Sequence, residues 1–406
     1  MTPCWCALLV TVLSLPAHAG EMIDSAAIAD ESRTDWPSYG RSYSEQRHSP
    51  LAQIAAANVN NLGLAWFMDL PGIKSLQATP LLVDGVLYFS GNDSIVFAVD
   101  ARSGQLRWRH DPEVWRHAGK RYRQLFPVNR GVAYWKGRIY VGTYDGRLIA
   151  LDAATGKPAW EVQTLEGETG YISGAPRAFN DKIIIGNGGT EAGRSRGYAT
   201  AYDAASGKLL WRFHTVPGNP ADGFENAAMA LAAKSWTGEW WKHGGGGTVW
   251  NAITYDPELN RVYLGTGNGS PWNHKVRSPD GGDNLFVCSI VSLDADSGEY
   301  RWHYQTTPGE SWDYTSAQDI VLASLAWEGK RRPVILHAPK NGFFYVLDRR
   351  DGKLLAADPI GKVTWADRVD LTTGRPIETP AARFPGNEGT ALPQFSRRTR
   401  LAGNVV

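Results

Sequence analysis

The amino-acid sequence predicts an all-β fold of the β-propeller type, and three observations support this prediction. Five segments share one pattern, in which a Gly follows an Asp by four residues and, in four of the five, a Trp follows that Gly by four more. The chain has 44 glycines and 17 tryptophans, and this glycine content exceeds the usual share of about 7%. Short apolar runs also alternate with turn residues. Radial blades of four strands explain the repeat and the composition together.

The repeated pattern gives each of its residues a structural role. We expect the Asp to accept hydrogen bonds from turn amides, the Gly to adopt a positive φ, and the Trp to fill the space between neighbouring blades. A β-sandwich, the alternative fold, would not predict regular tryptophan spacing. The five pairs are Asp100 and Gly104, Asp152 and Gly156, Asp203 and Gly207, Asp294 and Gly298, and Asp348 and Gly352.

Local signals place individual strands and one further unit. Residues 81–99 contain three β-rich runs, and the first two are joined by Asp84-Gly85, a dipeptide typical of tight hairpins. The interval between the third and fourth repeated Asp is almost twice as long as the others. Because residues 251–265 within it again read as strand, turn and strand, we predict a sixth, degenerate unit there.

The charge of the chain excludes one class of partner. Its 42 Lys and Arg residues balance 41 Asp and Glu residues, for a formal net charge of +1. Nucleic-acid-binding proteins usually carry a basic excess that neutralises phosphates, so no nucleic-acid partner is expected. The expected partner is a small molecule or a protein.

Residues 1–19 have the pattern of a cleaved secretory signal. An apolar run over residues 7–15 precedes a small-residue motif at 17–19. No later stretch approaches the roughly 18–20 apolar residues of a membrane span. The remaining chain is therefore expected to be periplasmic or secreted. It keeps one cysteine, Cys288, so no intrachain disulfide is expected, and it has no C-x-x-C-H motif for haem attachment.

Several ordered motifs go beyond what a propeller alone requires. They occupy residues 129–131, 173–176, 186–191, 238–250, 265–268, 312–314 and 339–342. With them the sequence resembles the pyrroloquinoline quinone (PQQ) dependent alcohol dehydrogenases, from about Asp35 to about Gly386. Members of that family are eight-bladed propellers with the cofactor on the central axis. The resemblance implies a propeller domain of the PQQ-dehydrogenase type over residues 20–386, incomplete in this chain.

Three oxygen-bearing side chains, Glu191, Asn268 and Asp313, lie in these motifs. Each of them alone is most simply a turn-capping residue. Because they come from three different blades they can converge on the axis, and oxygen ligands without His or Cys select a hard cation such as Ca²⁺. The resemblance implies that they are the metal ligands. Lanthanide-using members carry a further carboxylate where this chain has Thr315, so the resemblance implies calcium.

The cofactor implied by the resemblance is a planar orthoquinone with three carboxylates, and its site needs cations, hydroxyls and a stacking surface. Four glycines at 244–247 lie close to Trp250 in the sequence and would let the backbone approach a ligand. A nucleotide site is the alternative, but this glycine run lacks the Lys-Ser or Lys-Thr of a phosphate loop. The implied PQQ contacts are Gln77, Arg130, Ser173, Gly189, Thr190, Trp250 and Lys340.

The resemblance also implies a reaction. Ca²⁺ acts as a Lewis acid on the quinone carbonyl, Asp313 takes the proton of a small alcohol as general base, and a hydride passes to the quinone. The product is an aldehyde or a ketone. Lys340 stabilises negative charge that develops on the quinone oxygen. Since the chain has no haem motif, a separate electron acceptor is implied, a soluble or membrane-bound cytochrome.

The sequence departs from the family in three places. Gln124 and Leu125 stand where many members have a vicinal cysteine pair, Gln77 stands where many have a cofactor-contacting Glu, and residues 387–406 form a divergent tail. Residues 62–66 read as the second half of a repeat unit, which strands from the far end of the family chain complete. A second chain could complete the propeller here. The competing hypothesis is an exported propeller fragment, cofactor-free or inactive, that serves as a protein-binding scaffold.

Overall fold

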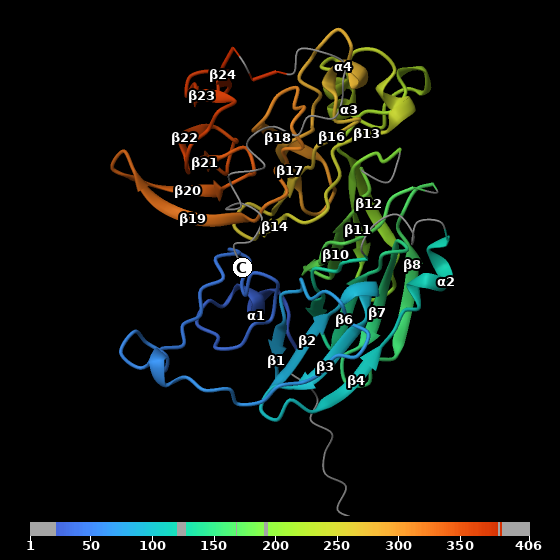
Figure 1. Cartoon of the computed structure of the whole chain (residues 1–406), viewed down its shortest axis with the longest axis vertical. Coiled ribbons are helices and arrows are strands. Elements are labelled where there is room, and N and C mark those ends of the chain that lie inside the picture. The colour runs from blue at the N-terminus through green and yellow to red at the C-terminus, as the bar shows by residue number, and fades with distance from the viewer. Residues whose placement is uncertain (1–21, 120–126, 168, 191–193, 381, 384–406) are drawn as a thin grey trace, which may run out of the picture.

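Five four-stranded antiparallel sheets make up most of the part of the chain that the structure describes (Figure 1). The predicted all-β propeller is therefore confirmed. The computed structural model describes residues 22–119, 127–167, 169–190, 194–380 and 382–383. The predicted signal at 1–19, the positions Gln124 and Leu125, and the tail at 387–406 lie outside these residues. In the described part of the chain, no helix has both the length and the apolar character that crossing a membrane requires.

In every sheet the strands follow one another in chain order. The first blade contains β1 (Leu81–Val83), β2 (Val86–Ser90), β3 (Val96–Asp100) and β4 (Leu106–His110). The second contains β5 (Ala133–Trp135), β6 (Arg138–Gly142), β7 (Arg147–Asp152) and β8 (Pro158–Gln163). The third contains β9 (Arg177–Phe179), β10 (Lys182–Gly186), β11 (Tyr198–Asp203) and β12 (Leu209–His214).

The last two blades are followed by a two-stranded sheet. The fourth blade contains β14 (Ile253–Asp256), β15 (Arg261–Gly265), β17 (Ser289–Asp294) and β18 (Tyr300–Gln305). The fifth contains β19 (Ile320–Trp327), β20 (Lys330–His337), β21 (Phe343–Asp348) and β22 (Leu354–Pro359). The small sheets pair β13 (Gly245–Gly246) with β16 (Gly269–Ser270), and β23 (Ala366–Val369) with β24 (Pro376–Glu378). The short α-helices are α1 (Ser25–Ala29), α2 (Val114–His117), α3 (Ala227–Ala233) and α4 (His274–Arg277).

The repeated Asp–Gly–Trp pattern lies where the third strand of a blade turns into the fourth. Asp100 accepts hydrogen bonds from two turn amides, at 3.1 and 3.0 Å, and Gly104 has a φ of +71°. Trp108 lies against Gly156 of the next blade and donates its indole N–H to the Ala153 carbonyl at 2.9 Å. The predicted roles of all three residue types are confirmed. The same packing joins Trp66 to Gly104, Trp160 to Gly207, Trp211 to Gly298 and Trp302 to Gly352.

The predicted hairpin is confirmed, whereas the predicted sixth unit is wrong. Asp84 and Gly85 join β1 to β2, and both have positive φ, as a tight hairpin turn requires. Residues 251–265 contain β14 and β15, which belong to the fourth blade, because β15 pairs with β17 in the register Val262 to Leu293. The interval is long because one insertion, with α3 and β13, precedes this blade, and a second insertion, with β16 and α4, separates β15 from β17.

A further copy of the repeat, missed in the sequence, lies in the turn between β23 and β24. Asp370 accepts hydrogen bonds from the amides of Thr372 and Thr373, and Gly374 has a φ of +73°. Tyr304 takes the place of the tryptophan and donates its hydroxyl to the Gly374 carbonyl at 2.8 Å. Glu378 stands where the other units have Trp or Ala, so the Asp-to-Gly spacing of residues 370 and 374 was the available sequence signal.

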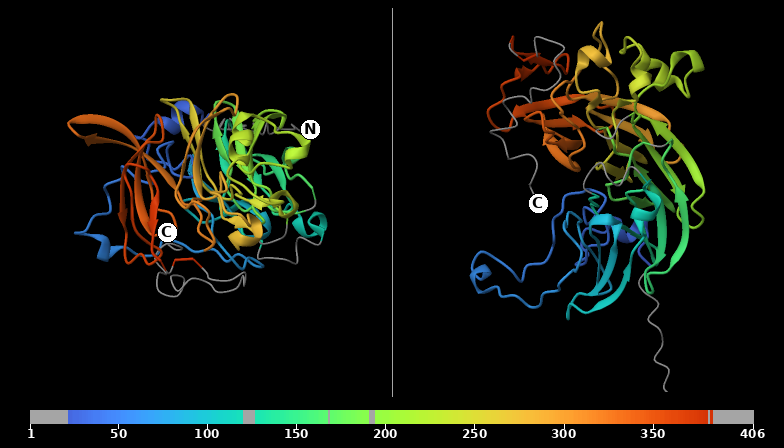
Figure 2. Two further views of the ribbon diagram at one scale, coloured as in Figure 1. Left: turned by 90° about the horizontal axis from the view of Figure 1, so that it is seen from above. Right: turned by 45° about the vertical axis from the view of Figure 1, so that its right-hand side comes forward.

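The blades follow one another around an arc, with their first strands on the inner side (Figures 1 and 2). The first strands of successive blades contact each other, β5 with β9, β9 with β14 and β14 with β19. The N-terminal segment crosses this inner side. Trp36 pairs with Leu82 in the first blade, the Tyr43 hydroxyl donates to Ala178 in the third, and Gln46 donates to the Leu322 carbonyl in the fifth. Residues distant in the sequence are thereby held in one body.

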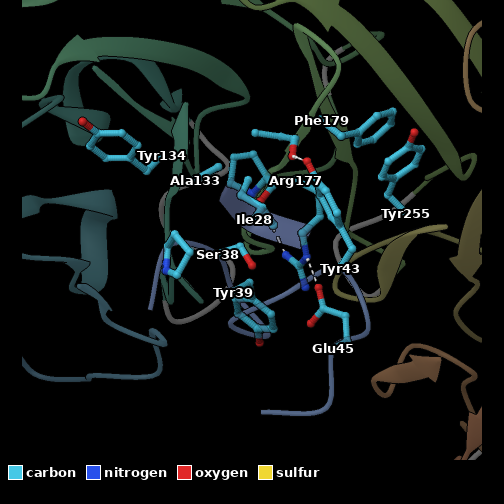
Figure 3. Close-up of a pocket in the computed structure, with 13 residues that line it drawn as sticks. Ile28, Ser38, Tyr39, Tyr43, Glu45, Ala133, Tyr134, Arg177, Phe179 and Tyr255 are labelled. Carbon is cyan, nitrogen blue, oxygen red and sulfur yellow. Dashed lines mark hydrogen bonds and ion pairs between the residues drawn. The ribbon is translucent and has the colours of Figure 1, made fainter. Parts of the chain in front are cut away.

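A buried ion pair anchors the N-terminal segment to β9 (Figure 3). Arg177 donates from Nε to Glu45 at 3.0 Å, and its guanidinium carbon lies 3.8 Å from the centre of the Tyr39 ring. Burial raises the pKa of Glu45, and the charge of Arg177 opposes that shift. These residues line a small pocket that contains none of the predicted site residues. The ion pair of Arg177 and Glu45 therefore joins β9 to the N-terminal segment.

Candidate functional site

Eight of the ten predicted site residues lie at one end of the blades, and the strand directions explain why. They lie either before the first strand of a blade or after its second strand. Since these strands are antiparallel, the start of one and the end of the other share one end of the sheet. The first group is Arg130, Ser173, Trp250 and Asp313, and the second group is Gly189, Thr190, Asn268 and Lys340.

Arg130, Ser173 and Trp250 form one group of contacts. Arg130 donates from Nη1 to Ser173 Oγ at 2.7 Å, and its guanidinium carbon lies 4.7 Å from the centre of the Trp250 ring. The main chain supports this placement, because the Arg130 amide donates to the Ser173 carbonyl at 3.0 Å. Burial lowers the pKa of Arg130, and a guanidinium nevertheless stays charged in proteins. The group presents a cation, a hydroxyl and an aromatic face together.

Gln77 lies apart from this group. Its side chain is exposed, and it makes no hydrogen bond to any residue that the structure describes. The main chain near it does reach the site, since the Thr79 amide donates to the Arg130 carbonyl at 3.2 Å. The loop of Arg130 is held further by Asn129, whose amide nitrogen donates to the Gly142 carbonyl at 2.8 Å.

The loops of Thr190 and Asn268 meet at the same end. Ser270, two residues after Asn268, donates its hydroxyl to the Thr190 carbonyl at 3.2 Å. Gly189, before Thr190, is buried with a φ of +112°. Glu191, the next residue along the chain, is one of those whose structure is not described.

Asn268 is a buried residue with an amide oxygen that could contact a ligand. Only 1% of its surface is exposed, and its amide nitrogen donates to the Gly269 carbonyl at 3.3 Å. Its Oδ1 accepts no hydrogen bond within the described part of the chain. Amide oxygens are among the ligands that a hard cation prefers, so this side chain fits coordination of such a cation.

Asp313 and Lys340 form an ion pair. Lys340 Nζ lies 2.9 Å from Asp313 Oδ2, and the two side chains are 39% and 28% exposed. Asp313 has a φ of +59°, and strained backbone of this kind clusters at functional sites. Asn341 supports Lys340 from the next position, because its amide donates to the Thr306 carbonyl at 3.1 Å and to the Tyr345 hydroxyl at 2.8 Å. Asp313 Oδ1 accepts no hydrogen bond from the described residues.

The sequence analysis missed Glu310, a fully buried residue between these loops. Its carboxylate accepts the amide N–H groups of Gly269 at 3.0 Å, Trp312 at 3.0 Å and Tyr314 at 3.2 Å. Burial raises the pKa of Glu310, and the charge of Arg277 and these amides oppose the shift. The available signal was an acidic residue three positions before the predicted base.

The donor set fits the two groups that the resemblance implies. An anionic planar quinone matches the guanidinium of Arg130, the hydroxyl of Ser173 and the face of Trp250. A hard cation matches the free oxygens of Asn268 and Asp313. The donor types at this end of the blades therefore suit an anionic aromatic ligand and a cation.

Comparison with known proteins shows which family this chain resembles. Residues 36–363 match a family model described as PQQ: glucose/ethanol/alcohol dehydrogenase, beta-propeller domain. Over 382 residues, 93% of this chain, the sequence is 56% identical to the quinohemoprotein alcohol dehydrogenase ADH IIB of Pseudomonas putida. It is 46% identical over 90% of its length to a 1-butanol dehydrogenase (cytochrome c) of Thauera butanivorans.

A solved structure shows the same fold. The quinohemoprotein alcohol dehydrogenase of Comamonas testosteroni is 52% identical and superposes with a TM-score of 0.85 over 89% of this chain and 54% of its own. The chain likewise spans 55% of the Pseudomonas putida relative. Because the family model covers most of the chain, this protein belongs to the PQQ glucose/ethanol/alcohol dehydrogenase β-propeller family.

Proposed function

We propose that this chain oxidises a small alcohol to an aldehyde or ketone with PQQ and Ca²⁺. The observation that carries the proposal is the ion pair of Asp313 and Lys340, which Glu310 connects to the loop of Asn268. A base, a cation and a free amide oxygen at one end of a propeller suit alcohol oxidation at a quinone. Family membership supports the same chemistry.

The residues of the site divide between the two ligands. Arg130 would bind a carboxylate of PQQ while Ser173 holds the guanidinium in orientation, and Trp250 offers its face for stacking. Asn268 and Asp313 would hold Ca²⁺ together with Glu191. Thr315, where lanthanide-using members carry a carboxylate, favours calcium. When bound, PQQ accepts the hydride and Ca²⁺ polarises its carbonyl.

Asp313 is the proposed general base. Lys340 uses one acceptor site of Oδ2, and an ionised carboxylate has about four such sites, so Asp313 could contact Ca²⁺ and still accept the hydroxyl proton of the alcohol. An ammonium has three N–H donors, and Asp313 uses one of those of Lys340. The others are free to stabilise negative charge on a quinone oxygen. Both side chains are only partly exposed, which limits competition from water.

We further propose a periplasmic location and a cytochrome as electron acceptor. The signal-like pattern of residues 1–19 supports export. The Thauera butanivorans relative carries cytochrome c in its name, which supports a cytochrome as the redox partner. An artificial electron acceptor replaces that partner in the assay below.

Titration of the purified chain with PQQ, with and without Ca²⁺, tests the proposal. We expect Ca²⁺-dependent uptake, seen in the absorbance of PQQ, and a higher melting temperature, because ligand at 100 times its Kd stabilises a fold by about 2.7 kcal/mol. A screen of primary alcohols then measures turnover. A folded chain that takes up no PQQ would refute the proposal and favour the protein-binding scaffold.

A further inference from the structure

Glu310 links the main chain of two proposed ligand loops. Its Oε1 accepts the amide of Gly269, the residue that follows Asn268, at 3.0 Å. Its Oε2 accepts the amides of Trp312 and Tyr314, at 3.0 and 3.2 Å. These two amides flank Asp313 on either side. One carboxylate therefore fixes the backbone around Asp313 relative to the backbone after Asn268.

Arg277, in α4, contacts both Glu310 and Gly269. It is fully buried and donates to the Glu310 carbonyl at 2.6 Å and to Asn284 Oδ1 at 3.0 Å. A Cβ on Gly269 would lie 2.2 Å from the guanidinium carbon of Arg277, so only glycine allows this approach. The Arg277 charge offsets the buried carboxylate, and the guanidinium packs directly against Gly269.

The buried charges of Glu310 and Arg277 and the backbone strain at Asp313 cost free energy of folding, and packing alone does not explain why they are present. Buried charges are often no more stabilising than apolar residues of similar volume. Asp313 also keeps a positive φ, a strain of about 1–3 kcal/mol that persists only where the surroundings impose it. The hydrogen bonds of Glu310 to the amides on both sides of Asp313 are what impose it here.

We infer that Glu310 is a positioning residue for the metal site, which sets the distance between the Asn268 and Asp313 ligands. This inference rests on the proposed function. Residues that orient metal ligands typically change metal affinity about 10- to 100-fold when mutated. Glu310 would act on Ca²⁺ binding before any chemistry takes place.

Ca²⁺ affinity of the full chain, measured calorimetrically without PQQ, tests the inference. E310Q keeps one acceptor oxygen but turns an NH₂ group toward an amide N–H that now has no acceptor. E310D keeps both oxygens and the charge but is one methylene shorter, so it cannot reach both loops. We expect each variant to weaken Ca²⁺ binding about 10- to 100-fold. In a D313N background, the effect of E310Q should shrink, because the two residues act together.

D256N is the matched control. Asp256 is also fully buried, accepts the Glu258 amide at 3.0 Å and the Tyr263 hydroxyl at 3.0 Å, and lies in the hairpin between β14 and β15. D256N should lower the melting temperature without changing Ca²⁺ affinity.

Each other outcome identifies what has failed. If D313N and N268A weaken Ca²⁺ binding while the Glu310 variants do not, the inference is overturned and the proposed function stands. If D313N and N268A also leave Ca²⁺ binding unchanged, the metal site of the proposed function fails. If both Glu310 variants unfold while D256N folds, Glu310 supports folding alone and the inference is again overturned.

Discussion

Gly156→Ala measures how much the packing of tryptophan on glycine contributes to stability. Gly156 has a φ of +70°, and an alanine in this conformation costs about 1–2 kcal/mol. A Cβ there would also lie 2.6 Å from Cε3 of Trp108, closer than real carbon contacts. Displacing the indole adds an overpacking cost of about 1–3 kcal/mol. The free energy of unfolding should therefore fall by about 2–5 kcal/mol in total.

Gly137→Ala separates the two contributions. Gly137 lies in the same blade, has a φ of +78°, and an added Cβ would meet no atom within 4 Å. In this variant the free energy of unfolding should fall only by the backbone contribution, about 1–2 kcal/mol. Urea unfolding followed by circular dichroism measures both, and near-ultraviolet spectra report the Trp108 environment. Equal losses in the two variants would refute the packing argument, and so would an undiminished effect of Gly156→Ala in a Trp108→Ala background.

Three further predictions follow from the site and the core. Asp313→Asn should abolish turnover and leave the circular dichroism spectrum unchanged; retained turnover would exclude Asp313 as the base. Arg130→Lys, which removes the planar fork that contacts Ser173, should weaken PQQ binding about tenfold in an equilibrium titration; unchanged affinity would contradict the assignment. Burial lowers the pKa of His337 from 6.5 to about 4, so the unfolded chain takes up a proton at higher pH than the folded chain. Stability should therefore fall as pH decreases from 6.5 toward 4, by about 2 kcal/mol at pH 5, and His337→Asn should reduce this loss in urea titrations; an unchanged pH dependence would contradict the argument.

The repeat and its local structure could be predicted from the sequence, because they depend on contacts between nearby residues. Asp100 and Gly104 form their turn through contacts within a few residues, so pattern and conformation coincide. Asp84 and Gly85 likewise set a hairpin without help from distant residues. The motifs of Arg130 and Asp313 were recognisable because the chemistry of a ligand site restricts which residues it can use.

The way in which distant segments combine could be seen only in the folded chain. The strands at 253–265 carry the same local signals whether they start a new blade or continue an interrupted one, and only their pairing with β17 showed the second case. Glu310 is separated by 41 residues from Gly269 and reaches it only in the folded chain. Such contacts depend on which blades lie side by side. The residue types of the site can be recognised from short sequence motifs. The placement of Asn268 relative to Asp313 exists only after the blades have packed.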